Sequence, residues 1–137
     1  ESVAAGSTAS ARGLARFLEG LLAVLKGAHG VVTADTLARL VAPSSHGADP
    51  VMGRECGYGR GFMVNLAEHD YGRSCSPSTF GHSAYGGMTA AFCDPDRDLV
   101  VAFHFNGRVD AESAVSYRRP ALVERLYRSL FEDLQRG

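Results

Sequence analysis

The chemically richest segment of the chain is residues 80–87, which read Phe-Gly-His-Ser-Ala-Tyr-Gly-Gly. It places an imidazole, His82, directly before a hydroxyl, Ser83, and surrounds both with glycines that let the backbone come close to another group. Imidazole and hydroxyl groups take part in proton transfer and nucleophilic attack in many enzymes. This segment is therefore the first candidate for a functional site.

Ser83 itself is a candidate nucleophile of the α/β-hydrolase type, which lies on a strained turn with the pattern Gly-x-Ser-x-Gly. Gly81 provides the first glycine, but Tyr85 stands where the second is required. Such a serine also follows a buried strand and opens a helix, whereas residues 74–79 are polar and the segment after residue 87 favours a hairpin. The pattern therefore makes a nucleophilic Ser83 the weaker alternative.

The residues that follow this segment give it a wider setting. The chain continues with Phe-Cys-Asp-Pro-Asp-Arg at residues 92–97 and with a valine-rich stretch that ends at Asn106. Together with residues 80–87, this order resembles the third-motif region of serine β-lactamase-like hydrolases, the family of class C β-lactamases, DD-peptidases and carboxylesterases of the same fold. In that family a Lys-Thr-Gly or His-x-Gly motif lies on an inner strand, and an Asp-Pro turn follows the next strand. Three further segments resemble family segments in the same order, namely residues 7–17, 33–37 and 58–62. The resemblance therefore covers nearly the whole chain, but it matches only the C-terminal part of such an enzyme.

The resemblance implies a role for each residue of the motif. His82 matches the Lys/His position that supports the proton network of the catalytic serine and tyrosine, and the backbone N–H of Tyr85 matches one of two oxyanion-hole donors. Ser83 matches a hydroxyl that bonds a substrate carboxylate or carbonyl. Ala84 replaces the usual glycine, and its methyl group would crowd a substrate lying along the strand. This replacement favours a simple ester over a penicillin-like substrate.

The family's nucleophile is absent from the chain. These enzymes acylate the serine of a Ser-x-x-Lys motif, in which the lysine helps to activate the hydroxyl. Lys26 is the only lysine, and Ala23 stands three residues before it, so no Ser-x-x-Lys motif exists here. The second family motif, Tyr-x-Asn, is also missing.

By resemblance, the chain is part of a serine hydrolase that cleaves small-molecule esters or amides, β-lactams included, through an acyl-serine intermediate without a metal or organic cofactor. The isolated chain is expected to be inactive, because a missing N-terminal part or a complementary chain must supply the nucleophile. The competing hypothesis is a non-enzymatic α+β binding or regulatory module that kept the scaffold.

Apolar periodicity predicts two helices in the first part of the chain. The first is capped by Ser7 or Thr8 and has apolar residues from Leu14 to Leu25. The second is capped by Thr33 and ends before Pro43.

The remaining elements complete an α+β pattern. We expect a surface loop, a strand, a polar loop and a hairpin with an Asp-Pro turn, at residues 44–55, 57–65, 67–78 and 88–105. A last helix has Pro120 in its first turn, and Arg118 and Arg119 beside it have no evident role because the helix dipole disfavours cations there. The predicted fold is an antiparallel sheet flanked by helices, resembling the C-terminal part of the β-lactamase/transpeptidase-like fold.

Composition restricts the class of protein. The chain has 137 residues, of which 45% are hydrophobic, and a net charge of −1. This composition predicts one globular domain over residues 1–137, which the resemblance implies is incomplete. The near-zero charge favours neither nucleic acid nor membrane partners. Three cysteines without Cys-x-x-Cys spacing favour reduced thiols and a cytoplasmic location over disulfides or a zinc site with His69 or His82. Without its N-terminal strands, the domain would expose a strand edge and apolar helix faces, so self-association is expected.

Overall fold

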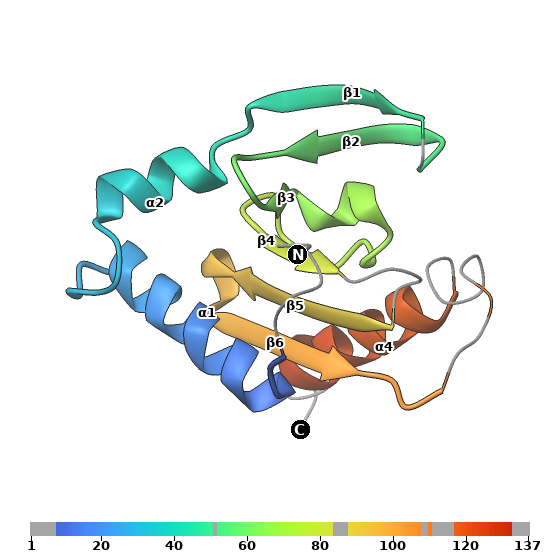
Figure 1. The fold of residues 1–137 in the computed structure, drawn as a ribbon. Coiled ribbons are helices and arrows are strands. Elements are labelled where there is room, and N and C mark those ends of the chain that lie inside the picture. Colours follow the sequence, from blue (N-terminus) through green and yellow to red (C-terminus); the bar gives the residue numbers. More distant parts are fainter. Residues whose placement is uncertain (1–7, 51, 84–87, 108–109, 111–116, 133–137) are drawn as a thin grey trace.

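The computed structural model describes residues 8–50, 52–83, 88–107, 110 and 117–132. Among these residues, six strands form one antiparallel sheet in sequence order (Figure 1): β1 (Ser45–Asp49), β2 (Arg54–Tyr58), β3 (Met63–Val64), β4 (Phe80–Ser83), β5 (Thr89–Asp94) and β6 (Leu99–His104). Every strand pairs with its neighbour in sequence, and all connections are short except residues 65–79 between β3 and β4. The predicted α+β class with an antiparallel sheet is confirmed.

Helices cover both faces of this sheet. Helix α1 (Ala11–Leu25) packs on one face together with α2 (Ala34–Val41), and α4 (Arg119–Tyr127) packs on the other and continues as a π-helical turn, η5 (Arg128–Glu132). In Figure 1, α1 passes in front of β6 and α4 lies behind β5. None of the helices in the described ranges is long and apolar enough to span a membrane.

Two separate apolar clusters follow from the alternation of strand side chains. The cluster on the α1 face joins helix residues to the strand residues Phe80 and Cys93; its helix members are Leu18, Leu21, Leu22, Val24 and Leu37. The cluster on the α4 face joins Val123 and Tyr127 to Ala90 and Phe92. Because Phe92 and Cys93 are adjacent on β5, they point to opposite faces and belong to different clusters.

Local sequence signals place most of the helix ends. Thr33 caps α2 as predicted, because its Oγ1 accepts a bond from the Thr36 amide at 3.2 Å. Helix α1 begins later than predicted, since Ser10 is the cap and accepts from the Gly13 amide at 3.0 Å. Pro120 lies in the first turn of α4 as expected.

Three predictions between the helices are wrong. Residues 44–55 are not a loop: they contain β1, a polar outer strand whose pairing with β2 depends on backbone bonds rather than on apolar side chains. Residues 57–65 are two strands, β2 and β3, separated by a turn in which the Gly59 amide bonds the Phe62 carbonyl at 2.9 Å.

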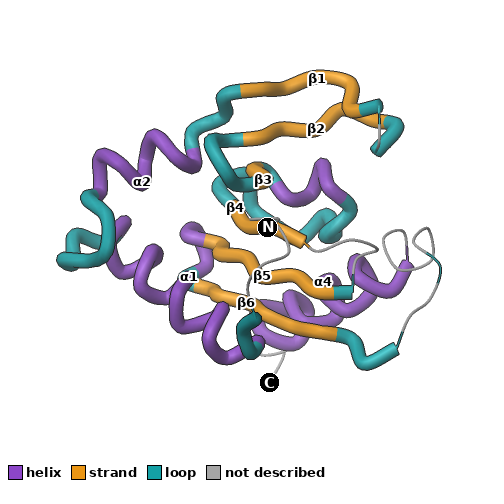
Figure 2. The backbone as a smooth tube through the Cα atoms, in the orientation of Figure 1, coloured by secondary structure: helices purple, strands orange, loops and turns teal. Residues whose placement is uncertain are grey.

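The third is the polar loop predicted at residues 67–78. It contains the end of a short 3₁₀ helix, η1 (Leu66–His69), that follows β3 (Figure 2). Leu66, His69 and Tyr71 are fully buried there. The polar composition of residues 67–78 predicts exposure, but part of this segment is buried in the core.

Candidate active site

Strand β4 presents the predicted motif to both faces of the sheet. Phe80 is buried in the cluster on the α1 face, so His82, two residues further on, shares that face and Ser83 points to the α4 face. His82 is exposed and Ser83 is half-buried. The predictions for Ala84 and for the Tyr85 backbone N–H fall outside the described residues.

The geometry of His82 defines its tautomer. Its Nδ1 lies 2.9 Å from the carbonyl oxygen of Ser83, which can only accept, so Nδ1 carries the hydrogen. In the neutral ring, Nε2 therefore has a lone pair, and no described residue bonds it. The exposed side of the ring is an acceptor for a hydroxyl proton.

The hydroxyl of Ser83 has a different setting. Its Oγ accepts a bond from Nη1 of Arg119 at 3.2 Å, on the opposite side of the sheet from His82. Its own hydrogen faces the Met63 sulfur at 4.0 Å, a weak acceptor at long range. Ser83 thus accepts from a cation and keeps its own O–H as a donor.

Arg119 is the largest fully buried side chain of the described residues, with 2% of its surface exposed. Its Nε donates to the Asp70 carbonyl at 3.2 Å, its Nη2 to the His69 carbonyl, and its guanidinium lies 4.2 Å from the centre of the Tyr71 ring. Burial lowers the pKa of Arg119 from its ordinary value, against the opposing influence of Tyr71 and Asp70. Three carbonyl and hydroxyl acceptors replace the water that a cation loses on burial.

Two more buried residues, His69 and Tyr71, contact Arg119. His69 donates from Nε2 to the Gly57 carbonyl at 2.7 Å, which leaves its buried Nδ1 without a described partner. Burial lowers the pKa of His69, so the ring is neutral at pH 7. The buried Tyr71 hydroxyl makes no hydrogen bond of ordinary geometry; burial raises the pKa of that phenol, while the Arg119 charge and the neighbouring Ser83 hydroxyl oppose the increase.

Sequence reasoning missed Arg119, Tyr71 and His69 as neighbours of the motif. The contact between Arg119 and Ser83 spans 36 residues, and no local pattern encodes it. One signal was present in the sequence. An arginine at the N-terminus of a helix is unfavourable because it opposes the helix dipole, so its presence there indicates that other groups, such as buried hydrogen-bond acceptors, stabilise it.

The cysteines are not suited to act as nucleophiles. All three are buried and free of disulfides. Burial raises the pKa of Cys75 to about 11 and that of Cys93 to about 12, so both remain thiols at pH 7. Within the described ranges, no three His, Cys, Asp or Glu side chains gather as metal ligands would.

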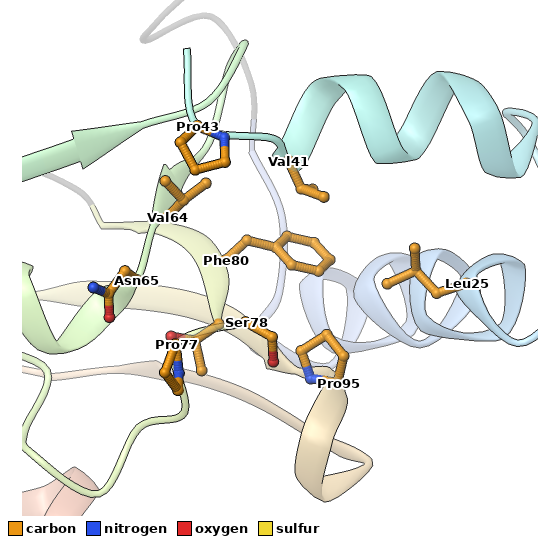
Figure 3. A pocket seen from close by; sticks show the side chains of 10 residues that line it. Leu25, Val41, Pro43, Val64, Asn65, Pro77, Ser78, Phe80 and Pro95 are labelled. Atoms are coloured by element: carbon orange, nitrogen blue, oxygen red, sulfur yellow. The ribbon is translucent and has the colours of Figure 1, made fainter. Parts of the chain in front are cut away.

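An apolar pocket of about 320 Å³ opens on the same face of β4 as Phe80. Figure 3 shows the Phe80 ring in its middle, between Val41 at the end of α2 and Leu25 at the end of α1. Its polar lining comes only from Asn65, Ser78 and Thr79, so it contains no titratable group. The pocket is suited to apolar contact and not to acid–base chemistry.

Comparison with known proteins connects this arrangement to a family. A β-lactamase family model, described as "Beta-lactamase", matches residues 2–124. No curated protein sequence gives a significant match.

Solved structures share the fold. A β-lactamase from Mycobacterium bovis superposes with a TM-score of 0.69 at 22% identity, over 86% of this chain and 43% of its own. A penicillin-binding protein homolog from Caulobacter crescentus gives 0.61 at 27% identity, over 82% and 30%. A family VIII carboxylesterase gives 0.64 at 26% identity, over 85% and 30%.

The chain therefore spans less than half the length of each of these similar structures. The family model covers most of its residues, and the antiparallel sheet with helices on both faces agrees with these folds. The chain belongs to the β-lactamase family of serine hydrolases.

Proposed function

We propose that this chain forms one wall of the active site of a serine hydrolase that cleaves small-molecule ester or amide bonds, with esters preferred. The observation that carries the proposal is the position of His82 within a chain matched by the family model: it is exposed at the end of an inner strand with Nε2 available. An inner strand is a rigid support, which suits a group that must meet a reacting proton.

The proposed reaction divides the work between this chain and a missing part. The nucleophilic serine of that part attacks the substrate carbonyl and passes its proton into a hydroxyl network, which delivers a proton to the alcohol or amine as the oxyanion collapses to an acyl-serine. Water then attacks the acyl-serine, which releases the carboxylic acid and restores the serine hydroxyl. His82 Nε2 accepts a hydrogen bond from the hydroxyl network that carries this proton. The Tyr85 N–H would stabilise the oxyanion, Ser83 would bond a substrate carbonyl or carboxylate, and Ala84 would limit the room along the strand.

Exposed apolar surfaces support the proposal that part of the enzyme is missing from this chain. In the described sheet β6 is an outer strand, and Leu99 to Phe103 along it are all only half-buried. On the helices, Phe17 is 53% exposed and Leu122 and Leu130 are exposed as well. We infer that an N-terminal part or a complementary chain covers these surfaces and supplies the nucleophile, so that residues 1–137 are an incomplete domain.

Hydrolysis of nitrophenyl acyl esters and of a chromogenic cephalosporin tests this function. The chain alone should be inactive, and the chain joined to the region preceding it in its gene should cleave the esters faster than the cephalosporin. His82→Ala should reduce kcat of the joined protein about 100-fold, within the usual range for a proton-transfer group. His104→Ala is the matched control, because His104 is another exposed histidine of the sheet and bonds only Thr89 among the described residues.

Two outcomes would contradict the proposal. Full activity in the isolated chain that Ser83→Ala abolishes would return the role of nucleophile to Ser83. Absence of activity in the joined protein would favour the non-enzymatic binding or regulatory module.

The same surfaces predict that the isolated chain self-associates and binds a hydrophobic dye. Sedimentation at increasing concentration measures this directly. A stable monomer without dye binding would mean that the chain needs no covering part.

A further inference from the structure

The role of Arg119 begins with its unusual environment. The side chain starts on α4, is 2% exposed, and has no carboxylate within salt-bridge distance among the described residues. Placing a cation in the interior is unfavourable unless good acceptors surround it. The acceptors present are two backbone carbonyls and one hydroxyl. Hydrogen bonds to neutral groups, rather than an ion pair, therefore stabilise the buried guanidinium.

The guanidinium links three parts of the fold. Nε and Nη2 donate to the carbonyls of Asp70 and His69, next to and at the end of η1, and Nη1 donates to Ser83 Oγ on β4. The Tyr71 ring lies against the flat face of the group at 4.2 Å. A planar fork with fixed donor directions can make these bonds at once, which the single ammonium of lysine cannot do with the same geometry.

We infer that Arg119 is a positioning residue for the active-site motif: by donating to Ser83 Oγ, it fixes the serine side chain and leaves the serine O–H to donate to a substrate oxygen. This inference rests on the proposed function. The bond from Arg119 occupies one of the two lone pairs of Oγ, and the positive charge strengthens the serine O–H as a donor. The matching substrate group is an acceptor, a carbonyl or carboxylate oxygen.

The Met63 sulfur supports this assignment. At 4.0 Å it competes weakly for the hydrogen of the Ser83 hydroxyl, whose other polar neighbours are Arg119 and the buried Tyr71 hydroxyl. Ser83 as a whole is half-buried, while its Oγ lies against the buried Arg119 side chain, so a substrate oxygen must approach Oγ from the side that Arg119 does not occupy. A substrate oxygen would therefore replace a poor acceptor with a good one.

A double-mutant cycle in the joined protein tests the inference. Arg119→Met should reduce kcat/KM for nitrophenyl esters about 10- to 100-fold when Ser83 is present, the range expected for a hydrogen bond to a charged group. In the Ser83→Ala background, the same change should reduce kcat/KM less than about threefold. Equal losses in both backgrounds would overturn the inference, because a purely structural Arg119 would act regardless of Ser83.

The neighbouring arginine is the matched control. Arg118 donates to the Gly107 carbonyl at 2.9 Å and lies 4.3 Å from the Phe105 ring, without any described contact to the motif. Arg118→Met should leave kcat/KM within about twofold in both backgrounds. If Arg119→Met does not fold, Arg119→Lys replaces it in the cycle, since it keeps the charge and loses the fork.

Unfolding of the same four proteins in urea separates this inference from the proposed function. Non-additive unfolding midpoints would support the Arg119–Ser83 contact even in a protein without esterase activity, whereas additive midpoints would overturn the contact itself. An inactive wild type with non-additive midpoints would overturn the proposed function and the substrate-donor role of Ser83, and would leave the contact as a structural one.

Discussion

The two faces of the sheet are built from different chemistry. On the α1 face, the cluster around Leu21 and Phe80 is apolar throughout. On the α4 face, the apolar residues Phe92 and Val123 pack beside buried polar groups, of which Arg119 and Asp94 are charged types that are 2% or less exposed. The stability of the α1 face depends on the buried apolar area and on close packing, while that of the α4 face also depends on paired hydrogen-bond donors and acceptors.

Asp94 shows how the α4 face works. At the end of β5 its carboxylate accepts from the Tyr127 hydroxyl at 2.6 Å, from the Ser76 hydroxyl at 2.5 Å and from the Ser76 amide at 3.2 Å. It also pairs with Arg97 at 3.3 Å. These contacts tie the C-terminal helix to the hairpin turn and to the connection that leads into the motif strand.

The largest effect should come from removing that carboxylate. Asp94→Ala leaves the Tyr127 and Ser76 donors buried without an acceptor, so we expect a loss of about 3–5 kcal/mol in the free energy of unfolding. Urea denaturation of the purified chain measures it. Asp96→Ala, an exposed change in the same turn, should stay within about 0.5 kcal/mol. Similar losses in both variants would mean that the network does not anchor α4.

A cavity on the α1 face should have a smaller effect. Leu21→Ala removes a side chain that is 3% exposed and should lower the free energy of unfolding by about 2–4 kcal/mol. Phe17→Ala on the same helix is the control, because 53% of Phe17 is exposed and its loss should be below about 1 kcal/mol. Urea midpoints that rank Phe17→Ala as the more damaging change would contradict the assigned packing of α1.

Two tyrosines of the α4 face offer a sharper test. Tyr127→Phe removes the bond to Asp94 and should lower the free energy of unfolding by about 1–2 kcal/mol. Tyr71→Phe removes a buried hydroxyl that has the Ser83 hydroxyl beside it but makes no hydrogen bond of ordinary geometry, so its effect should be near zero or stabilising. Thermal unfolding of the two variants in parallel compares them, and a greater loss for Tyr71→Phe would reveal a partner for its hydroxyl.

The smallest effect concerns pH. Burial lowers the pKa of His69 below its unfolded value of about 6.5, so the unfolded state binds the proton more readily. Stability should therefore be complete above about pH 6.5 and decrease as the pH falls toward the folded pKa, by at most about 1.4 kcal/mol per pH unit from this group.

Urea midpoints at pH 7.5 and pH 5.5 measure this dependence. His69→Gln, which keeps a donor for the Gly57 carbonyl, should flatten it, and the exposed control His104→Gln should not. An unchanged slope in His69→Gln would mean that other groups carry the pH dependence.

The α1 face was predictable because its signals are local. Leucines at helical spacing predict α1 and most of its buried side, although Phe17 and Leu25 of the same stripe are exposed. The hairpin of β5 and β6 follows from its Asp-Pro turn, and the register Asp94↔Leu99 confirms it. Strand β1 was missed because a polar outer strand has no apolar alternation.

For the candidate site, the sequence by itself determined the motif of residues 80–87 and the absence of Ser-x-x-Lys, since both depend only on residue types and spacing along the chain. Only the tertiary structure decided which face of the sheet His82 and Ser83 each take and that Arg119 reaches Ser83 from α4. The physical reason is that a buried cation is acceptable only where distant backbone carbonyls and a hydroxyl converge on it, and chain folding alone produces that convergence.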